Sequence, residues 1–251
     1  HMWDQLTRHE EHNDSYTQMI EQNGTSDALY IPLQFFCCRN DGLALPLIAL
    51  QYHDVRLEFE FESAANLSTD NICTMSNTTL LVNYVYLDSE ERKRFAQASH
   101  EYLIEQLQFT GVETAAVGNN KFRLNFNHPV KELVWAHAAS ENDDLGDYDR
   151  CSNALLQLNG HDRFSAQSGK FFENVQQNIH HTRGGVAGVN VYSFAINPEE
   201  HQPSGTCNFS RIDNATLSVT TATAGGVVYI YGVNYNVLRV MSGMGGVAYS
   251  N

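Results

Sequence analysis

The sequence has few basic residues, no metal-binding cysteine pair and no long apolar run. Lys and Arg together number 15, against 29 Asp and Glu, so the formal net charge is -14. Direct binding to nucleic acid needs clustered basic side chains that neutralise phosphates, and the densest basic stretch, residues 90–94, carries acids of its own. The composition therefore argues against a nucleic-acid partner. No stretch of about 18 consecutive apolar residues exists, so no transmembrane helix is predicted.

The motifs of catalysis and cofactor binding are also missing. The chain has no nucleophile elbow, no paired-carboxylate motif, no phosphate-binding loop and no dinucleotide fingerprint. Its five cysteines form no CxxC pair, which favours free thiols over a zinc site. The sequence at residues 9–12 is HEEH, which lacks the spacing that places two imidazoles on one helical face. We therefore predict no enzyme, no catalytic residue, no metal ligand and no cofactor.

Two polar stretches leave a weaker alternative open. The loop at residues 140–149 offers Asp143, Asp144, Asp147 and Asp149 as oxygen ligands for calcium, but the spacing of an EF-hand is absent, so an exposed loop is favoured. The adjacent His180 and His181 would point to opposite faces of an extended strand and make a poor chelating pair.

What the chain does contain is a succession of short β-prone segments. With 251 residues, 42% of them hydrophobic, it can bury a substantial core. Asp88 and the acids after it predict the start of a helix that continues to about residue 107. The pattern is typical of an all-β jelly-roll sandwich with one or two helical insertions. The main predicted strands lie at residues 29–38, 52–61, 80–87, 108–117, 121–127, 132–138, 154–159, 189–196, 204–219 and 227–241.

Three polar residues interrupt one of these predicted strands. Arg211, Asp213 and Asn214 lie in an otherwise apolar stretch, where an isolated buried charge would be costly. Arg211 and Asp213 are two residues apart, so a strand would place both on one face. We interpret them as structural or interface residues that hydrogen-bond neighbouring loops or an adjacent subunit.

Five separated stretches carry a family resemblance. Residues 29–36, 39–53, 86–97, 193–214 and 236–246 resemble, in the same order, the major capsid protein of nucleocytoplasmic large DNA viruses, the group of chloroviruses, mimiviruses and iridoviruses. The resemblance implies a double jelly roll whose homotrimers form pseudo-hexagonal capsomers of an icosahedral shell, around an inner membrane and a double-stranded DNA genome. It also implies a virion protein that is assembled in the host cytoplasm and contacts neighbouring capsomers and minor capsid proteins. Such a subunit would lie close to the inner membrane without inserting into it.

The family's chain is longer, so the resemblance implies a C-terminal portion or a shortened chain. The expected organisation is a polar segment at residues 1–28 that includes a cloning remnant, followed by closing strands of an incomplete first roll at 29–63. A linker at 64–71 and a second roll at 72–251 complete it.

One other function and one modification are considered beside the capsid role. A carbohydrate-binding jelly-roll module or a virion surface attachment protein is the alternative, favoured by 12 tyrosines and 2 tryptophans. Acceptor sequences for glycosylation occur at five asparagines, for which an unmodified polar side chain is the simpler interpretation. They are Asn23, Asn66, Asn77, Asn208 and Asn214.

Overall fold

The computed structural model describes residues 2–20, 28–61, 77–139, 151–221 and 226–249. The chain divides into two compact units. Unit 1 comprises residues 1–44, 103–237 and 249–251, and unit 2 comprises residues 45–102 and 238–248. The sandwich lies mainly in unit 1, and the ends of two of its strands continue into unit 2.

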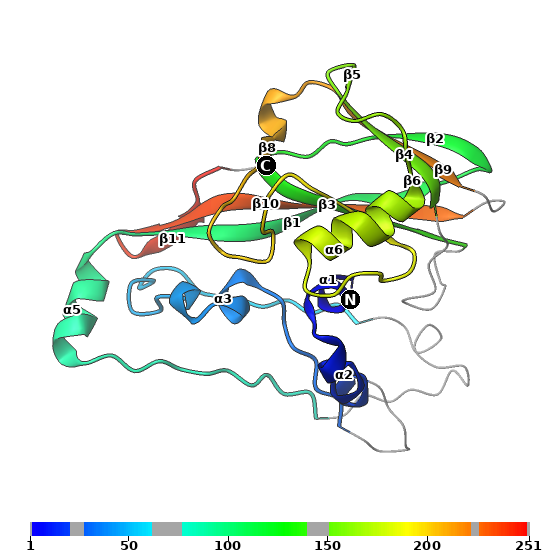
Figure 1. The fold of residues 1–251 in the computed structure, drawn as a ribbon. Coiled ribbons are helices and arrows are strands. Elements are labelled where there is room, and N and C mark those ends of the chain that lie inside the picture. Colours follow the sequence, from blue (N-terminus) through cyan, green and yellow to red (C-terminus); the bar gives the residue numbers. More distant parts are fainter. Residues whose placement is uncertain (1, 21–27, 62–76, 140–150, 222–225, 250–251) are drawn as a thin grey trace. The chain divides into compact units, whose positions relative to one another are not determined.

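Two antiparallel sheets form this sandwich (Figure 1). Sheet A has the strand order β1 (His100–Thr114), β10 (Val227–Met241), β3 (Pro129–Ala138) and β7 (Val189–Ser193), with β8 (Cys207–Asn208) on β3 and β11 (Met244–Val247) on β10. Sheet B has the order β2 (Gly118–Arg123), β9 (Ala215–Thr221), β4 (Cys151–Leu158) and β5 (His161–Asp162), with β6 (Gln167–Ser168) on β4.

The main core lies between the inner faces of the two sheets. Trp135 of β3 packs edge-on against Phe172, and both side chains are fully buried together with Leu156 and Leu217 of sheet B. Phe172 comes from a π-helical turn, η3 (Phe171–Gln176), which continues into α6 (Gln177–His180). Burying each large apolar side chain stabilises the fold by about 2 kcal/mol. The predicted jelly-roll sandwich with helical insertions is confirmed.

The strands predicted for the first roll, and the first strand predicted for the second roll, are not formed. Residues 29–38 contain an extended stretch and α3 (Phe36–Arg39), which is followed by the 3-10 helix η2 (Asp41–Leu43). Residues 54–61 and 80–87 carry no strand pairing, and their apolar side chains up to Tyr86 are exposed. The strand prediction was wrong for these stretches because alternation shows only that a segment can pair, while a strand needs a partner.

The predicted long helix is correct at its start and wrong at its end. In α5 (Ser89–Gln97), Asp88 and Glu91 form a capping box. The helix ends at Gln97 and strand β1 begins at His100. Within β1, Ile104 is buried while the flanking side chains are only partly so, which is the alternation of a strand rather than of a helix. In unit 2, β11 pairs with the end of β10, so the glycine-rich C-terminal stretch forms a hairpin.

The N-terminal segment is helical and partly buried. It forms α1 (Met2–Thr7), the 3-10 helix η1 (Glu10–His12) and α2 (Asn13–Ile20). Leu6 is 0% exposed and packs with Val134, Val189 and Val191 on the outer face of sheet A. The predicted polar segment is exposed at residues 9–12, while α1 covers part of that face. Across the described ranges, no helix is long and apolar enough to span a membrane.

Candidate functional site

A cluster of charged side chains lies beneath α1, on the outer face of sheet A. Its centre is Trp3, whose ring is approached by the guanidinium carbon of Arg39 at 4.4 Å and by Lys131 Nζ at 5.2 Å from the ring centroid. The imidazole of His181 meets the same ring edge-on, with the centroids 6.1 Å apart. Cations over an indole face are attracted by its quadrupole, each by about 0.5–2 kcal/mol. Trp3 therefore holds α1 against the positively charged side chains of Arg39 and Lys131.

Lys131 is the buried cation of this cluster. Its side chain is 0% exposed, and Nζ lies 2.7 Å from Glu105 Oε1 while donating a hydrogen bond of 2.6 Å to the carbonyl oxygen of Pro198. Arg39 reaches the other oxygen of Glu105 at 3.1 Å. A buried charge is tolerated only when it is paired and hydrogen-bonded, and Lys131 meets both conditions.

A β-bulge explains why two consecutive residues of β3 join the cluster. In the pairing of β3 with β10, Val233 lies opposite Glu132 and Asn234 lies opposite Val130, so Lys131 is the extra residue. Its carbonyl oxygen accepts from the backbone N–H of both Phe194 and Ala195. In a regular strand, successive side chains point to opposite faces of the sheet, and a bulge changes the direction of these side chains. Lys131 and Glu132 can therefore both contribute charge to one cluster.

His181 links two carboxylates in the same cluster. Nε2 lies 3.1 Å from Glu132 Oε2, and Nδ1 lies 3.1 Å from Glu199 Oε1. Burial alone would lower the pKa of His181, but the carboxylates of Glu132 and Glu199 outweigh it and raise the pKa to about 9. The imidazole is therefore charged at neutral pH. Glu199 also accepts from the backbone N–H of Thr182 at 2.8 Å and from its hydroxyl group.

Neighbouring contacts extend the cluster without adding a reactive group. The ring of Tyr235 lies 5.6 Å from Lys131 Nζ, and burial followed by the charges of Glu105 and Glu132 raises its pKa to about 12. The backbone N–H of Arg183 donates to the carbonyl oxygen of Leu6 at 2.9 Å. No group of three or more metal-ligating side chains occurs within the described ranges. The arrangement is that of a structural clamp, in which the ring contacts of Trp3 and the hydrogen bond to Leu6 hold α1 over a network of ion pairs on sheet A.

Sequence reasoning missed this clamp. It dismissed His181 because adjacent histidines point apart in a strand, whereas His181 directly follows helix α6 and reaches its partners singly. The signal that was available is the charged pair Lys131-Glu132 at the start of the predicted strand 132–138. Burying a charge is costly, which is why Arg211 was singled out, and this cost is larger for Lys131 and Glu132 because both are fully buried.

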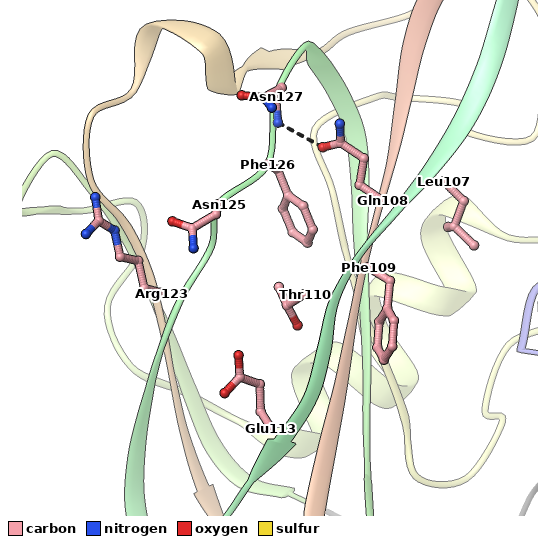
Figure 2. Close-up of a pocket in the computed structure, with 9 residues that line it drawn as sticks. All are labelled: Leu107, Gln108, Phe109, Thr110, Glu113, Arg123, Asn125, Phe126 and Asn127. Atoms are coloured by element: carbon pink, nitrogen blue, oxygen red, sulfur yellow. Dashed lines mark hydrogen bonds between the residues drawn. The ribbon is translucent and has the colours of Figure 1, made fainter. Parts of the chain in front are cut away.

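A polar cleft lies on the other side of β1 (Figure 2). Its volume is about 420 Å³, and it is lined by residues 107–110 and Glu113 of β1 and by residues 123 and 125–127, which end and follow β2. The backbone N–H of Asn127 donates to Gln108 Oε1 at 2.8 Å across it. Figure 2 shows Thr110, Glu113 and Asn125 around the opening, while Leu107 and Phe109 point away from it.

The three predicted interface residues lie outside both sites. Arg211 ends the 3-10 helix η4 (Phe209–Arg211), and Asp213 and Asn214 precede β9, so their placement in one strand was wrong. All three are exposed. The backbone N–H groups of Asp213 and Asn214 donate to Asn159 Oδ1 at 3.0 and 3.2 Å, which fixes this loop. Their role at an interface stays a prediction.

The glycosylation and calcium predictions fall partly outside the described residues. Asn77, Asn208 and Asn214 are exposed, and Asn208 caps η4 by accepting from the backbone N–H of Ser210. Outside the described residues lie Asn23, Asn66, the expected linker at 64–71 and the acidic side chains Asp143, Asp144, Asp147 and Asp149.

Comparison with known proteins identifies two matching family models. The model of the large eukaryotic DNA virus major capsid protein matches residues 91–246. The model of the major capsid protein N-terminus matches residues 1–88, and so includes the segment 1–28 that was expected to carry a cloning remnant.

Curated relatives and solved structures cover nearly the whole chain. The major capsid protein of Pyramimonas orientalis virus is 49% identical, over all of this chain and 71% of its own length. That of Paramecium bursaria Chlorella virus 1 is 40% identical, over 99% of this chain and 74% of the relative. A quasi-atomic model of the PBCV-1 virus capsid matches with a TM-score of 0.77 at 34% identity, covering 99% of this chain and 78% of that one. The first alignment extends over 288 positions, so that relative has insertions with no counterpart among these 251 residues.

Proposed function

The chain belongs to the major capsid protein family of large eukaryotic DNA viruses, and we propose from this premise that it works as a homotrimeric capsomer subunit. The capsid function predicted from the sequence is confirmed, because the named relatives are major capsid proteins and the fold matches a virus capsid structure. The observation that carries the proposal is the likeness to the PBCV-1 capsid over 99% of the chain.

The proposal extends to the partners and the place of assembly. The protein is a component of the virion capsid, where a capsomer subunit would contact neighbouring capsomers and minor capsid proteins. We further propose that assembly takes place in the host cytoplasm, close to an inner viral membrane that the protein does not enter. The formal charge of -14 supports a role without direct contact with the genome.

The role is proposed to be structural rather than enzymatic. The most strongly perturbed titratable group with carboxylate partners, His181, is held between Glu132 and Glu199 and covered by Trp3. Such a group is committed to ion pairs and is not presented to a substrate. The support for the proposal is this engagement, together with the membership of a capsid protein family.

Within the subunit, the clamp is proposed to tie the N-terminal domain to the second roll. The proposal is supported by the family models, since α1 and Arg39 lie in the region that matches the N-terminal model, while Lys131 and His181 lie in the region that matches the capsid model. The boundaries at residues 28, 63 and 71 stay a prediction.

Light scattering coupled to size-exclusion chromatography tests the proposed oligomer. A homotrimer has three times the 28.2 kDa mass of one chain, and a stable interface buries more than about 1,000 Å². A chain that remains monomeric at every concentration would contradict the proposed trimer. A glycan array measures the alternative function, since specific binding to one sugar class would favour a carbohydrate-binding or attachment protein.

A further inference from the structure

Within the described ranges, strand β1 has a free edge. It lies at one end of sheet A, and β10 is its one strand neighbour within the described ranges. An edge strand exposes backbone N–H and C=O groups that can pair with an added strand. The cleft of about 420 Å³ runs along the same part of β1, between it and residues 123–127 (Figure 2).

The outer side of this edge is apolar. Phe109 stacks on Tyr231 of β10 with ring centroids 4.6 Å apart, Tyr231 lies opposite Val134, and Val134 lies opposite Val191. This apolar row crosses four strands of the sheet. At β7 it is covered by Leu6 of α1, but at β1 Phe109 is 44% exposed and Leu107 is 63% exposed. The row therefore continues a covered surface and ends uncovered at the free edge.

The inner side of the same edge is polar and charged. Thr110 and Glu113 of β1 face the cleft, and Arg123 and Asn125 line it from the opposite wall (Figure 2). A strand added to β1 would therefore need apolar residues on one face and charged or polar residues on the other.

Residues 54–61 of this chain have that pattern and no strand partner among the described residues. Val55, Leu57, Phe59 and Phe61 alternate with Arg56, Glu58 and Glu60. The rings of Phe59 and Phe61 are stacked with centroids 6.5 Å apart, which places them on one side of an extended backbone. The four apolar side chains are 44–52% exposed. Eight extended residues span about 26 Å, enough to follow β1 from Glu105 to Val112.

We propose that residues 54–61 of a second copy of this chain add to the free edge of β1 as a strand. The apolar residues of the segment would extend the row that ends at Phe109, and its charged residues would face Arg123 and Glu113 in the cleft. Arg56 complements Glu113, and Glu58 or Glu60 complements Arg123.

The contact is heterologous, since a segment of one copy meets the edge of the next. A head-to-tail contact of this kind closes into a ring when the rotation permits. The inference thus rests on the proposed homotrimer and specifies how its copies join.

Two variants remove the two halves of the contact. Leu57→Pro removes a backbone donor from the segment, and Phe109→Glu places a charge on the apolar row. Each is expected to weaken association at least about tenfold in sedimentation velocity experiments. Leu81→Pro, in another unpaired extended stretch, and Ile179→Glu, an exposed residue of α6, are the matched controls and should associate like the unchanged chain.

Mixing the two variants decides the identity of the partner segment. The Leu57→Pro chain keeps an intact edge and the Phe109→Glu chain keeps an intact segment, so an equimolar mixture should form a heterodimer that neither variant forms alone. Loss of association in Phe109→Glu but not in Leu57→Pro would overturn the proposal in favour of contact between two apolar faces. Loss of association in Leu81→Pro would indicate that the extended stretch around Leu81, and not residues 54–61, binds the edge of β1. A trimer that survives all variants refutes the contact and leaves the capsomer proposal standing, whereas an unchanged chain that is always monomeric refutes both.

Discussion

Raising the pH should loosen the clamp at His181, because deprotonation of its imidazole removes the attraction to two carboxylates. The pKa of His181 is raised from 6.5 to about 9 in the folded state, with its side chain 0% exposed between two carboxylates. A group whose pKa is raised by folding contributes stability that is fully present below its unfolded pKa and is lost as the pH rises through the folded value. The free energy of unfolding should therefore fall between about pH 6.5 and pH 9.

The magnitude follows from the size of the shift. Each pKa unit corresponds to 1.36 kcal/mol, so a shift from 6.5 to about 9 predicts a loss of about 3 kcal/mol across this window. The Glu199 pKa is lowered, despite burial that would raise it, by hydrogen bonds from His181 and Thr182, so its contribution is lost only in acid. Burial raises the pKa of Cys151 to about 11 and that of Tyr235 to about 12, and both thus titrate above the window in the folded chain.

Urea unfolding at several pH values from 6 to 9 measures this loss. Replacing His181 by Gln removes the titrating group, so the unfolding free energy of this variant should depend far less on pH. His180→Gln is the matched control, because the neighbouring imidazole is hydrogen-bonded to the carbonyl oxygen of Ile196 at 2.9 Å and the variant keeps His181 between its two carboxylates. Identical slopes for the unchanged chain and His181→Gln between pH 6.5 and pH 9 would refute the assignment of the shift to this clamp.

Three further substitutions test other parts of the structure. Lys131→Met should lower the unfolding free energy by about 3 kcal/mol in urea titrations, because Glu105 then loses its buried partner; a change below 1 kcal/mol would show that Arg39 alone satisfies it. Asn159→Ala should cost about 1–2 kcal/mol and speed amide hydrogen exchange at Asp213 and Asn214, whose N–H groups it anchors; unchanged exchange would contradict this role. Arg211→Ala should leave the melting temperature of the isolated chain unchanged, since its side chain is exposed, but weaken the trimer in light scattering; an unaltered trimer would remove Arg211 from the interface.

Most strands of the second roll could be predicted because their partners are present in the same chain. The β-prone run at residues 227–241 matches β10, and the strands at 132–138, 154–159 and 189–196 are found close to their predicted positions. For residues 52–61 and 80–87 the sequence pattern was equally strong, yet no strand forms. The amino-acid pattern reports the ability to pair, whereas pairing depends on a neighbour that periodicity cannot reveal.

The prediction that the helix continues to residue 107 was wrong for a related reason. Leu103 and Phe95 fit a helical spacing, but the residues after His100 also alternate, and their side chains pack against β10 in sheet A. Tertiary pairing outweighs a local preference of a few tenths of a kcal/mol per residue. The start of the helix was predictable because a capping box is a local interaction that involves only Asp88 and Glu91.

The clamp shows what a sequence pattern could still have indicated. Every residue from Val130 to Ala138 is buried, so β3 must be covered on both faces. Its inner face meets the core between the sheets and its outer face meets α1. A strand that is buried on both faces typically lacks a regular alternation of apolar and polar residues. Two charges within such a strand demand partners from whatever element covers the outer face, and here Trp3 of α1 and Arg39 lie over them. Burial of β3 on both sides therefore requires the N-terminal segment, and removing α1 should expose Lys131 and Glu132 together rather than only an apolar face.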